Sequence, residues 1–215
     1  MTDPASFIIY AISLVIAITI HEFAHAFVAD YLGDPTPRHQ GRVTLNPLAH
    51  LDPVGTVLML FAHFGWGKPV QFDPFNLRNP RRDAAIISLA GPATNLIFAV
   101  IASIMLRIFF SLANPLLFQS SLSLASLLIT LITTNCVLAV FNLIPIHPLD
   151  GFKIVGGFLS PQQAREWYSL ERYGIIFLIF LLLPVFGQTA PISYLINPPL
   201  DFLFKFLLPG KIGVI

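Results

Sequence analysis

Two histidines four residues apart, with a glutamate directly after the first, are the residues best suited to chemistry in this sequence. His21, Glu22 and His25 lie in the stretch ITIHEFAHAFVAD, residues 18–30. Residues i and i+4 share one face of an α-helix, so both imidazoles can bind one metal ion. Glu22 is rotated by about 100° and can hold a water on that ion without being a ligand. The pattern H-E-x-x-H, with glutamate as general base, is typical of zinc-dependent peptide hydrolysis.

The composition indicates the environment of this motif. Of the 215 residues, 55% are hydrophobic and 11% are charged, and the mean hydropathy is +0.77. Soluble domains carry about 25% charged residues, so a bilayer must cover much of this apolar surface. The net charge of +1 provides no basic stripe for nucleic acid, and the single cysteine excludes an intrachain disulfide. The sequence therefore predicts an integral membrane protein.

Four apolar segments are long enough to cross a membrane, since a transmembrane helix needs about 20 residues. They are residues 7–29, 84–106, 124–141 and 175–196. Residues 56–64 are too short and favour a re-entrant or interfacial helix, while residues 200–208 fit either description. We predict an α-helical polytopic membrane protein with about four to six transmembrane helices in one domain, residues 1–215. Its catalytic core would occupy residues 7–160 and its C-terminal membrane helices residues 173–208.

The distribution of basic residues predicts the topology. Six of the twelve lysines and arginines lie between the first two spans and three between the last two, whereas residues 111–123 have none. The positive-inside rule then places the N-terminus outside and the two basic loops in the cytoplasm. Fourteen uncharged residues before His21 put this residue about 21 Å from the outer edge of the hydrocarbon and about 9 Å from the cytoplasmic edge. Ionisable residues at such depth are candidates for a functional site.

A catalytic zinc needs a third protein ligand, because it takes three and keeps one position for water. Asp150 follows the third span in the stretch FNLIPIHPLDGFKIVGG, residues 141–157, and the predicted topology brings it to the depth of the histidine pair. Prolines and a glycine break the helix there, and irregular backbone at that depth is tolerated where it lines a water-filled cavity. Asp30 and Asp34 are the competing acids, but Asp30 falls on a different helix face from His25. We therefore predict Asp150 as the third ligand.

Five short motifs follow one another along the first two thirds of the chain. They are HEFAH (residues 21–25), TLNPLAHLDPVGT (44–56), GWGKPV (65–70), AGPATN (90–95) and NLIPIHPLDG (142–151). Together they resemble the site-2 proteases, which are intramembrane zinc metalloproteases, in a minimal form without a PDZ or CBS domain. The resemblance implies one zinc ion per chain bound by His21, His25 and Asp150, with Glu22 as the base. It also implies that Asn142 helps to hold the substrate peptide near the metal.

The other histidines receive more ordinary interpretations. His147 stands where the family usually has proline, three residues before Asp150. Either it makes an auxiliary or inhibitory contact with the metal, or it is an interfacial residue, and we favour the second. His39, His50 and His63 have no second histidine at ligand spacing, so we interpret them as interfacial as well.

Two further features concern the predicted spans and the loop between them. Asn95 and Asn135 lie inside spans, where we expect them to bond across helices, and the small residues around Gly91 favour close helix packing.

The segment GWGKPVQFDPF, residues 65–75, is short and bounded by prolines. It predicts a small membrane-associated β element, an edge strand to which an unwound substrate could pair.

These observations predict an intramembrane zinc metalloprotease that hydrolyses peptide bonds in or near a transmembrane segment. Its partners would be a transmembrane protein or peptide substrate and the lipid bilayer, with no nucleic acid. The protein would be multi-pass, in the cell membrane if bacterial, with the active site toward the cytoplasmic side. Two alternatives remain. An inactive scaffold of the same fold would have lost Glu22 or a ligand, and a metal transporter would need ionisable residues through the whole depth of its spans.

Overall fold

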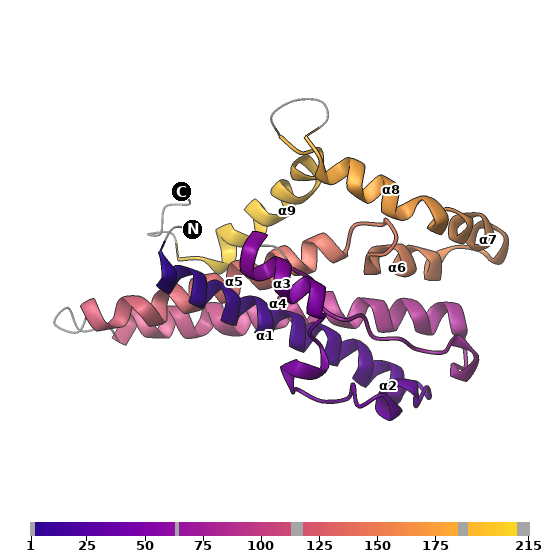
Figure 1. The fold of residues 1–215 in the computed structure, drawn as a ribbon, viewed down its shortest axis with the longest axis horizontal. Coiled ribbons are helices and arrows are strands. Elements are labelled where there is room, and N and C mark those ends of the chain that lie inside the picture. Colours follow the sequence, from indigo (N-terminus) through magenta and orange to yellow (C-terminus); the bar gives the residue numbers. More distant parts are fainter. Residues whose placement is uncertain (1–2, 63–64, 113–117, 185–188, 210–215) are drawn as a thin grey trace.

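The computed structural model describes residues 3–62, 65–112, 118–184 and 189–209, and these are mostly helical. Figure 1 shows the order of the helices, and short 3₁₀ turns lie at Pro47–Ala49 and Pro74–Asn76. The helices are α1 (Pro4–Tyr31), α2 (Thr36–His39), α3 (Pro53–Ala62), α4 (Pro80–Leu112), α5 (Phe118–Asn142), α6 (Asp150–Phe158), α7 (Pro161–Ser169), α8 (Glu171–Leu182) and α9 (Ile192–Leu207).

Three long helices form the body of the molecule. The segments Pro4–Tyr31, Pro80–Ser111 and Leu124–Asn142 are each long and apolar enough to cross a membrane. In Figure 1, α1 and α5 run in one direction and α4 runs in the opposite direction, packed against both. Three of the predicted spans are therefore confirmed as helices of the expected length and composition.

The fourth predicted span is divided into two helices. Residues 175–182 of this span belong to α8, which has 12 residues, and residues 192–196 belong to α9, which has 16 residues. Each helix is shorter than the roughly 20 residues that a straight span needs. Among the described residues only three helices meet the length and composition of a span, so a count of four to six stays a prediction. Helix α3 has 10 residues, about 15 Å, and is too short to cross, as expected.

Helix α9 packs against the C-terminal half of α4 and against α5. Leu200 of α9 belongs to the same buried cluster as Leu106 of α4 and Ile132 of α5. Its last turn is capped from α4, because Ser103 Oγ donates to the Leu207 carbonyl and Arg107 donates to the Phe206 carbonyl at 2.6 Å. These bonds satisfy carbonyl groups that the end of a helix leaves unpaired.

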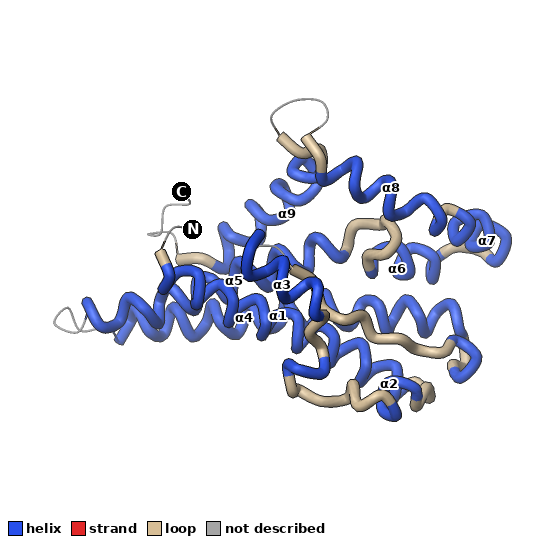
Figure 2. The backbone as a smooth tube through the Cα atoms, in the orientation of Figure 1, coloured by secondary structure: helices blue, strands red, loops and turns tan. Residues whose placement is uncertain are grey.

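The predicted edge strand is reduced to a single β-bridge. Leu51 and Gly67 form an isolated antiparallel bridge, and the Lys68 amide donates to the His50 carbonyl at 2.8 Å. The rest of the segment is loop up to the 3₁₀ turn at Pro74–Asn76 (Figure 2), and no strand is assigned in the part of the chain that the structure describes. Pro69 and Pro74 lack the N–H groups that a ladder requires, which explains why the pairing stops after one bridge.

Candidate metal centre

The two histidines of the H-E-x-x-H motif lie side by side on the face of α1 that packs against α4. His21 and His25 are buried, with 4% and 7% of their surface exposed. Their rings meet edge to face at a centroid distance of 4.6 Å, and their Nε2 atoms are 3.0 Å apart. The i, i+4 spacing on a continuous helix therefore does what the sequence predicted, since both Nε2 atoms point at one position.

Asp150 reaches the same position from the first turn of α6. Its Oδ2 atom lies 3.1 Å from His21 Nε2 and 3.2 Å from His25 Nε2. The chain turns sharply between α5 and α6, and Gly151 makes this turn possible. A Cβ atom at Gly151 would lie 2.3 Å from the Leu143 carbonyl oxygen, a distance that no side chain tolerates.

The three donors fit a zinc ion. Their ligand atoms all lie within 4.8 Å of one another. Two imidazole nitrogens and a carboxylate oxygen are common zinc ligands, and tetrahedral ligands placed about 2.0–2.1 Å from zinc are separated by about 3.3 Å. The separations of 3.0, 3.1 and 3.2 Å are close to that value, so the site needs little movement to hold one ion.

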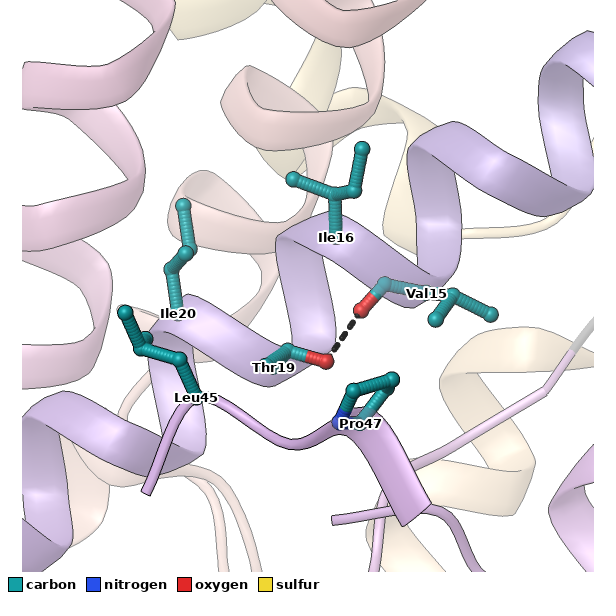
Figure 3. A pocket seen from close by; sticks show the side chains of 6 residues that line it. All are labelled: Val15, Ile16, Thr19, Ile20, Leu45 and Pro47. Carbon is teal, nitrogen blue, oxygen red and sulfur yellow. Dashed lines mark hydrogen bonds between the residues drawn. The ribbon is translucent and has the colours of Figure 1, made fainter. Parts of the chain in front are cut away.

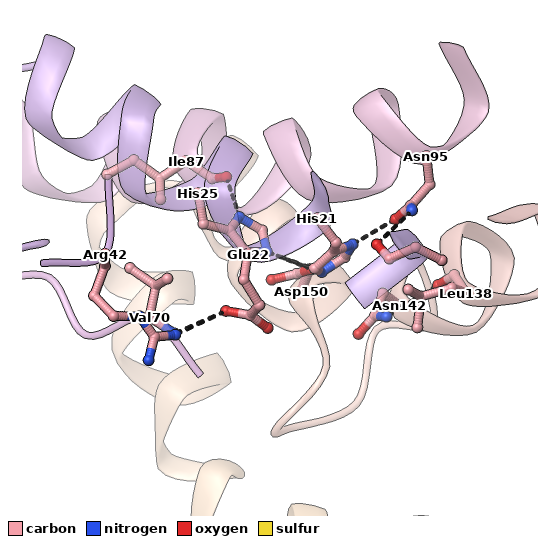
Figure 4. Close-up of polar contacts among 11 residues, drawn as sticks. His21, Glu22, His25, Arg42, Val70, Ile87, Asn95, Leu138, Asn142 and Asp150 are labelled. Carbon is pink, nitrogen blue, oxygen red and sulfur yellow. Dashed lines mark hydrogen bonds and ion pairs between the residues drawn. The ribbon is translucent and has the colours of Figure 1, made fainter. Parts of the chain in front are cut away.

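Helix α4 supports both rings from behind. His25 Nδ1 donates to the Ile87 carbonyl at 2.7 Å, and His21 Nδ1 lies 2.6 Å from Asn95 Oδ1. Figure 4 shows both contacts on the side of the rings away from Asp150. Metal-binding histidines usually bond their second nitrogen in this way. The sequence predicted that Asn95 would bond across helices, but it gave no sign that His21 would be the partner.

Gly91 lies between these two supports and faces the rings. A Cβ atom there would lie 2.6 Å from His25 Nε2 and 2.7 Å from His21 Cε1. The small residues around Gly91 predicted helix packing alone, and its closeness to the candidate metal ligands was not predicted. The spacing of Ile87, Gly91 and Asn95 is itself a signal, because residues four apart lie on one helix face.

Glu22 points away from α4, toward the loops that follow α2 and α3. Its Oε2 atom accepts from the Val70 amide at 2.9 Å and lies 3.7 Å from Arg42 Nη2. Arg42 is 3% exposed and also donates to the Lys68 carbonyl. Burial lowers the pKa of Arg42, but a guanidinium keeps its charge at neutral pH. No sequence pattern marked Arg42, because its position beside Glu22 depends on the path of the loop.

Asn142 ends α5, close to the turn that leads to Asp150. Its Nδ2 atom donates to the Leu138 carbonyl at 2.9 Å, so this bond stays within α5. One amide hydrogen and the side-chain oxygen are then left for another partner. We call His21, His25 and Asp150 the metal group. Figure 4 shows Asn142 beside this group and outside the bonds that join its three members.

The competing acids are engaged elsewhere. Asp30 forms an ion pair with Arg38, and Asp34 is fully buried. Asp34 accepts hydrogen bonds from Thr36 and from the Asp73 amide, among others. Burial raises the pKa of Asp34, but these hydrogen bonds together lower it below its usual value. Both acids therefore stabilise the turn after α1 and lie outside the metal group.

The remaining four histidines each have a different outcome. His147 Nδ1 lies 3.6 Å from Glu171 Oε1, and its ring packs against Phe152, so in this structure it is not one of the metal group. His39 is exposed. The interfacial interpretation of His50 is wrong, because this residue is fully buried and bonds the Thr44 carbonyl at 2.7 Å. His63 lies outside the described residues.

A small hollow lies on α1 on the N-terminal side of His21. Its volume is about 210 Å³, and Figure 3 shows that its wall is almost entirely apolar. It is lined by Val15, Ile16, Thr19, Ile20, Leu45 and Pro47. The one hydroxyl, of Thr19, already donates to the Val15 carbonyl at 2.6 Å, so the hollow offers no group for chemistry.

The fold and the three clustered donors together define a class: a multi-pass helical membrane protein with a His-His-Asp donor set whose two histidines are buried. Peptidase family M50 matches residues 9–120 and 112–183. The chain belongs to this family, the site-2 proteases. Its membership and the three apolar helices agree with the resemblance seen in the sequence motifs.

Named relatives support the same assignment. The chain is 39% identical over 175 residues to "Putative zinc metalloprotease YwhC" of Bacillus subtilis, covering 81% of this chain and 80% of that protein. It is 31% identical over 183 residues to "Putative zinc metalloprotease Rip2" of Mycolicibacterium smegmatis, covering 82% of this chain and 67% of that protein. The Rip2 protein of Mycobacterium tuberculosis is 29% identical over 183 residues, with the same coverage. No solved structure matches the chain.

Proposed function

We propose that this protein is an intramembrane zinc metalloendopeptidase, which cleaves peptide bonds in or near a transmembrane segment of a membrane-protein substrate. One observation carries the proposal. Two of the three clustered donor atoms, from His21 and His25, belong to a helix that is long and apolar enough to span a membrane. Buried ionisable groups at this depth are unfavourable unless they are used, and this donor set is one that zinc prefers.

The residues of the site divide into ligands and a base. His21, His25 and Asp150 would hold one zinc ion, which when bound acts as a Lewis acid toward a carbonyl and makes water nucleophilic near neutral pH. Glu22 would take a proton from the attacking water and return it to the leaving amine. Its place one residue after His21, with its carboxylate held by Val70 and Arg42, leaves it near the ligands but not among them.

The substrate must be extended at the bond that is cut. A helical carbonyl is shielded by its own hydrogen bond, so substrates with helix-breaking residues near the cleavage site are favoured. Asn142 would bond the main chain of this extended segment through its free oxygen and amide hydrogen. The single bridge between Leu51 and Gly67 marks where further β pairing with the substrate could begin.

The domain arrangement and topology are part of the proposal. Residues 1–215 would form one membrane domain, with residues 7–160 as the catalytic core and residues 173–208 as the C-terminal membrane helices. Helices α8 and α9 would together make the fourth crossing, interrupted in the middle. The positive-inside rule then places the active site toward the cytoplasmic side.

The test compares two variants near one another in sequence. Full-length protein is purified in detergent as wild type, Asp150→Ala and His147→Pro, and the zinc content of each is measured. In parallel, new protein N-termini are mapped in membranes of cells that express each form. We expect zinc and new N-termini in or next to transmembrane segments with wild type and His147→Pro, and neither with Asp150→Ala. The proposal fails if wild type binds no zinc, or if Asp150→Ala keeps both zinc and cleavage.

A further inference from the structure

Asn95 is a fully buried polar residue in the middle of α4, and it contacts three groups on two other helices. Its Oδ1 atom lies 2.6 Å from His21 Nδ1. Its Nδ2 atom donates to the Ala17 carbonyl at 3.0 Å and to Asn135 Oδ1 at 2.7 Å. A side chain amide has two hydrogens and one oxygen, so every polar atom of Asn95 has a partner.

The partners determine which way the Asn95 amide faces. The Ala17 carbonyl can only accept, so the nitrogen of Asn95 must point toward it and the oxygen must point toward His21. Asn135 is oriented in the same manner, because its own Nδ2 donates to the Leu131 carbonyl at 2.8 Å. Its oxygen therefore faces Asn95. Two backbone carbonyls thus fix the direction of the whole chain of bonds from α5 to α1.

The direction of this chain decides where the His21 proton resides. Because Asn95 presents an oxygen, His21 Nδ1 must carry the hydrogen and donate it. In a neutral imidazole the other nitrogen then has a free lone pair, and this is the Nε2 atom, 3.1 Å from Asp150 Oδ2. The opposite tautomer would put a lone pair against the Asn95 oxygen and an N–H group at the metal position.

We propose that Asn95, oriented by Asn135, is a positioning residue that holds His21 in the Nδ1–H tautomer with Nε2 directed at the metal. This inference rests on the proposed metal site. His25 is held separately, by the Ile87 carbonyl at 2.7 Å, so the two ligands have independent supports. One support is a backbone group that no substitution removes, and the other is a side chain that can be tested.

A purely structural role for Asn95, as a bond between membrane helices, makes a different prediction from a positioning role. Asn95→Asp keeps an oxygen that accepts from His21 but turns an anionic oxygen toward the Ala17 and Asn135 oxygens. Asn95→Leu has a similar volume and keeps no acceptor. A buried carboxylate oxygen that faces only other oxygens is more destabilising than a leucine. A structural role therefore predicts that Asn95→Asp is less stable and binds zinc more weakly than Asn95→Leu. A positioning role predicts that Asn95→Asp is less stable but binds zinc more tightly than Asn95→Leu.

The experiment measures zinc affinity and thermal unfolding of the full chain in detergent for wild type, Asn95→Asp, Asn95→Leu and Asn135→Leu. Thr133→Val is the matched control, because Thr133 bonds only carbonyls of its own helix α5. We expect Asn95→Leu to weaken zinc binding by about 10- to 100-fold, with Asn95→Asp and Thr133→Val close to wild type. Asn135→Leu should weaken binding less, and its effect should not add to that of Asn95→Leu.

Proton NMR of the zinc-loaded protein, labelled with ¹⁵N-histidine, gives a direct measure that does not depend on affinity. Wild type should show two Nδ1–H signals protected from exchange with water, one from each ligand histidine. In Asn95→Leu the His21 signal should lose this protection while the His25 signal keeps it as an internal control. Absence of a protected His21 Nδ1–H signal in zinc-loaded wild type overturns the inference.

The outcomes separate the inference from the proposed function. Wild type that binds no zinc refutes the proposed metal site and the inference with it. Zinc bound equally by wild type and Asn95→Leu, or more tightly by Asn95→Leu than by Asn95→Asp, overturns the inference and leaves the metal site standing. Zinc bound in the predicted order without any proteolysis refutes the proposed protease activity and supports the positioning role.

Discussion

The two faces of α1 at the candidate site are held by different kinds of structure. The histidine face, His21 and His25, is supported by Ile87 and Asn95 on the regular helix α4. The glutamate face, Glu22, is supported by the Val70 amide and by Arg42, both in segments without regular secondary structure. Figure 4 shows the two groups of partners on different sides of the helix.

This difference matches the work proposed for each face. A metal ligand must stay within about 0.5 Å of one geometry, and paired helices provide that rigidity. A general base must release and take up a proton and adjust as the substrate enters, and loop partners allow that adjustment. Changes on the histidine face should therefore alter metal binding, whereas changes on the glutamate face should alter catalysis alone. Three variants test this division, and a fourth tests the loop behind Glu22, in order of expected effect.

The largest effect is expected from Glu22→Gln. Glutamine keeps the size of the side chain and can still accept from the Val70 amide, but it cannot act as a base. Cleavage of a membrane substrate should fall by about 10²- to 10⁴-fold, while zinc content stays at the wild-type level. Rate assays beside metal analysis of the same preparation check both statements. Loss of zinc from this variant would show that the glutamate face also binds metal, and the division would be wrong.

The next effect is expected from Gly91→Ala, on the histidine face. The added methyl group would lie 2.6 Å from His25 Nε2, so the rings or α4 must move. Zinc affinity should fall by about 10- to 100-fold, as when the support of a metal ligand is lost. Zinc titration of the purified variant measures this change. Ile97→Ala, at an exposed position of the same helix, is the control and should bind zinc as wild type does.

A smaller effect is expected from Arg42→Met, on the glutamate face. Methionine preserves much of the buried volume but removes the contacts to Glu22 and the Lys68 carbonyl. Catalysis should fall about tenfold, or about 1.4 kcal/mol, because Glu22 loses its nearby cation and the loop loses the bond from Arg42 to the Lys68 carbonyl. Zinc content should not change. Arg38→Gln is the matched control, since Arg38 also pairs with an acid of α1 but is 68% exposed, and exposed pairs contribute little.

The smallest effect concerns pH and His50, which supports the loop behind Glu22. Burial, together with the charge of Arg42, lowers the pKa of His50 below its usual 6.5. Above pH 6.5 the residue is neutral in both folded and unfolded chains. As the pH falls below 6.5 the unfolded chain takes up a proton first, so stability is lost until the folded pKa is reached, at up to 1.4 kcal/mol per pH unit.

Thermal unfolding at pH 7.5 and pH 5.5 measures this contribution as the difference between wild type and His50→Asn. Wild type should lose more stability on acidification than the variant. The control is a variant of the exposed residue His39: His39→Asn should lose as much stability between pH 7.5 and pH 5.5 as wild type does. Equal losses for wild type and His50→Asn would show that His50 takes up its proton without opening the loop.

Part of the site was determined by the sequence alone. The spacing of His21, Glu22 and His25 on one continuous helix fixes the pair of candidate ligands and the separate direction of the glutamate, because helix geometry is local. The turn around Asp150 was also visible, since prolines and a glycine must interrupt a helix. The three long helices were predicted with ends that differ by up to six residues from the observed ones, because a run of about 20 apolar residues has few alternatives in a bilayer.

Other features depended on contacts between segments distant in sequence. The closeness of Asp150 to the histidines could be inferred from depth alone, but the distances of 3.1 and 3.2 Å follow from how α5 and α6 pack on α1 and α4. The partners of Glu22 come from loops whose paths no periodicity describes. Only one bridge forms where an edge strand was predicted. A strand needs a partner, and the prolines of this segment lack the N–H groups that pairing uses.

Asn95 shows the same limit most clearly. Its presence inside an apolar span marked it as a residue that would bond across helices, because an unsatisfied amide is unfavourable in lipid. Composition determined that a partner must exist. Only the packing of α1, α4 and α5 decided that the partner would be His21, and that the carbonyls of Ala17 and Leu131 would fix the direction of the bonds.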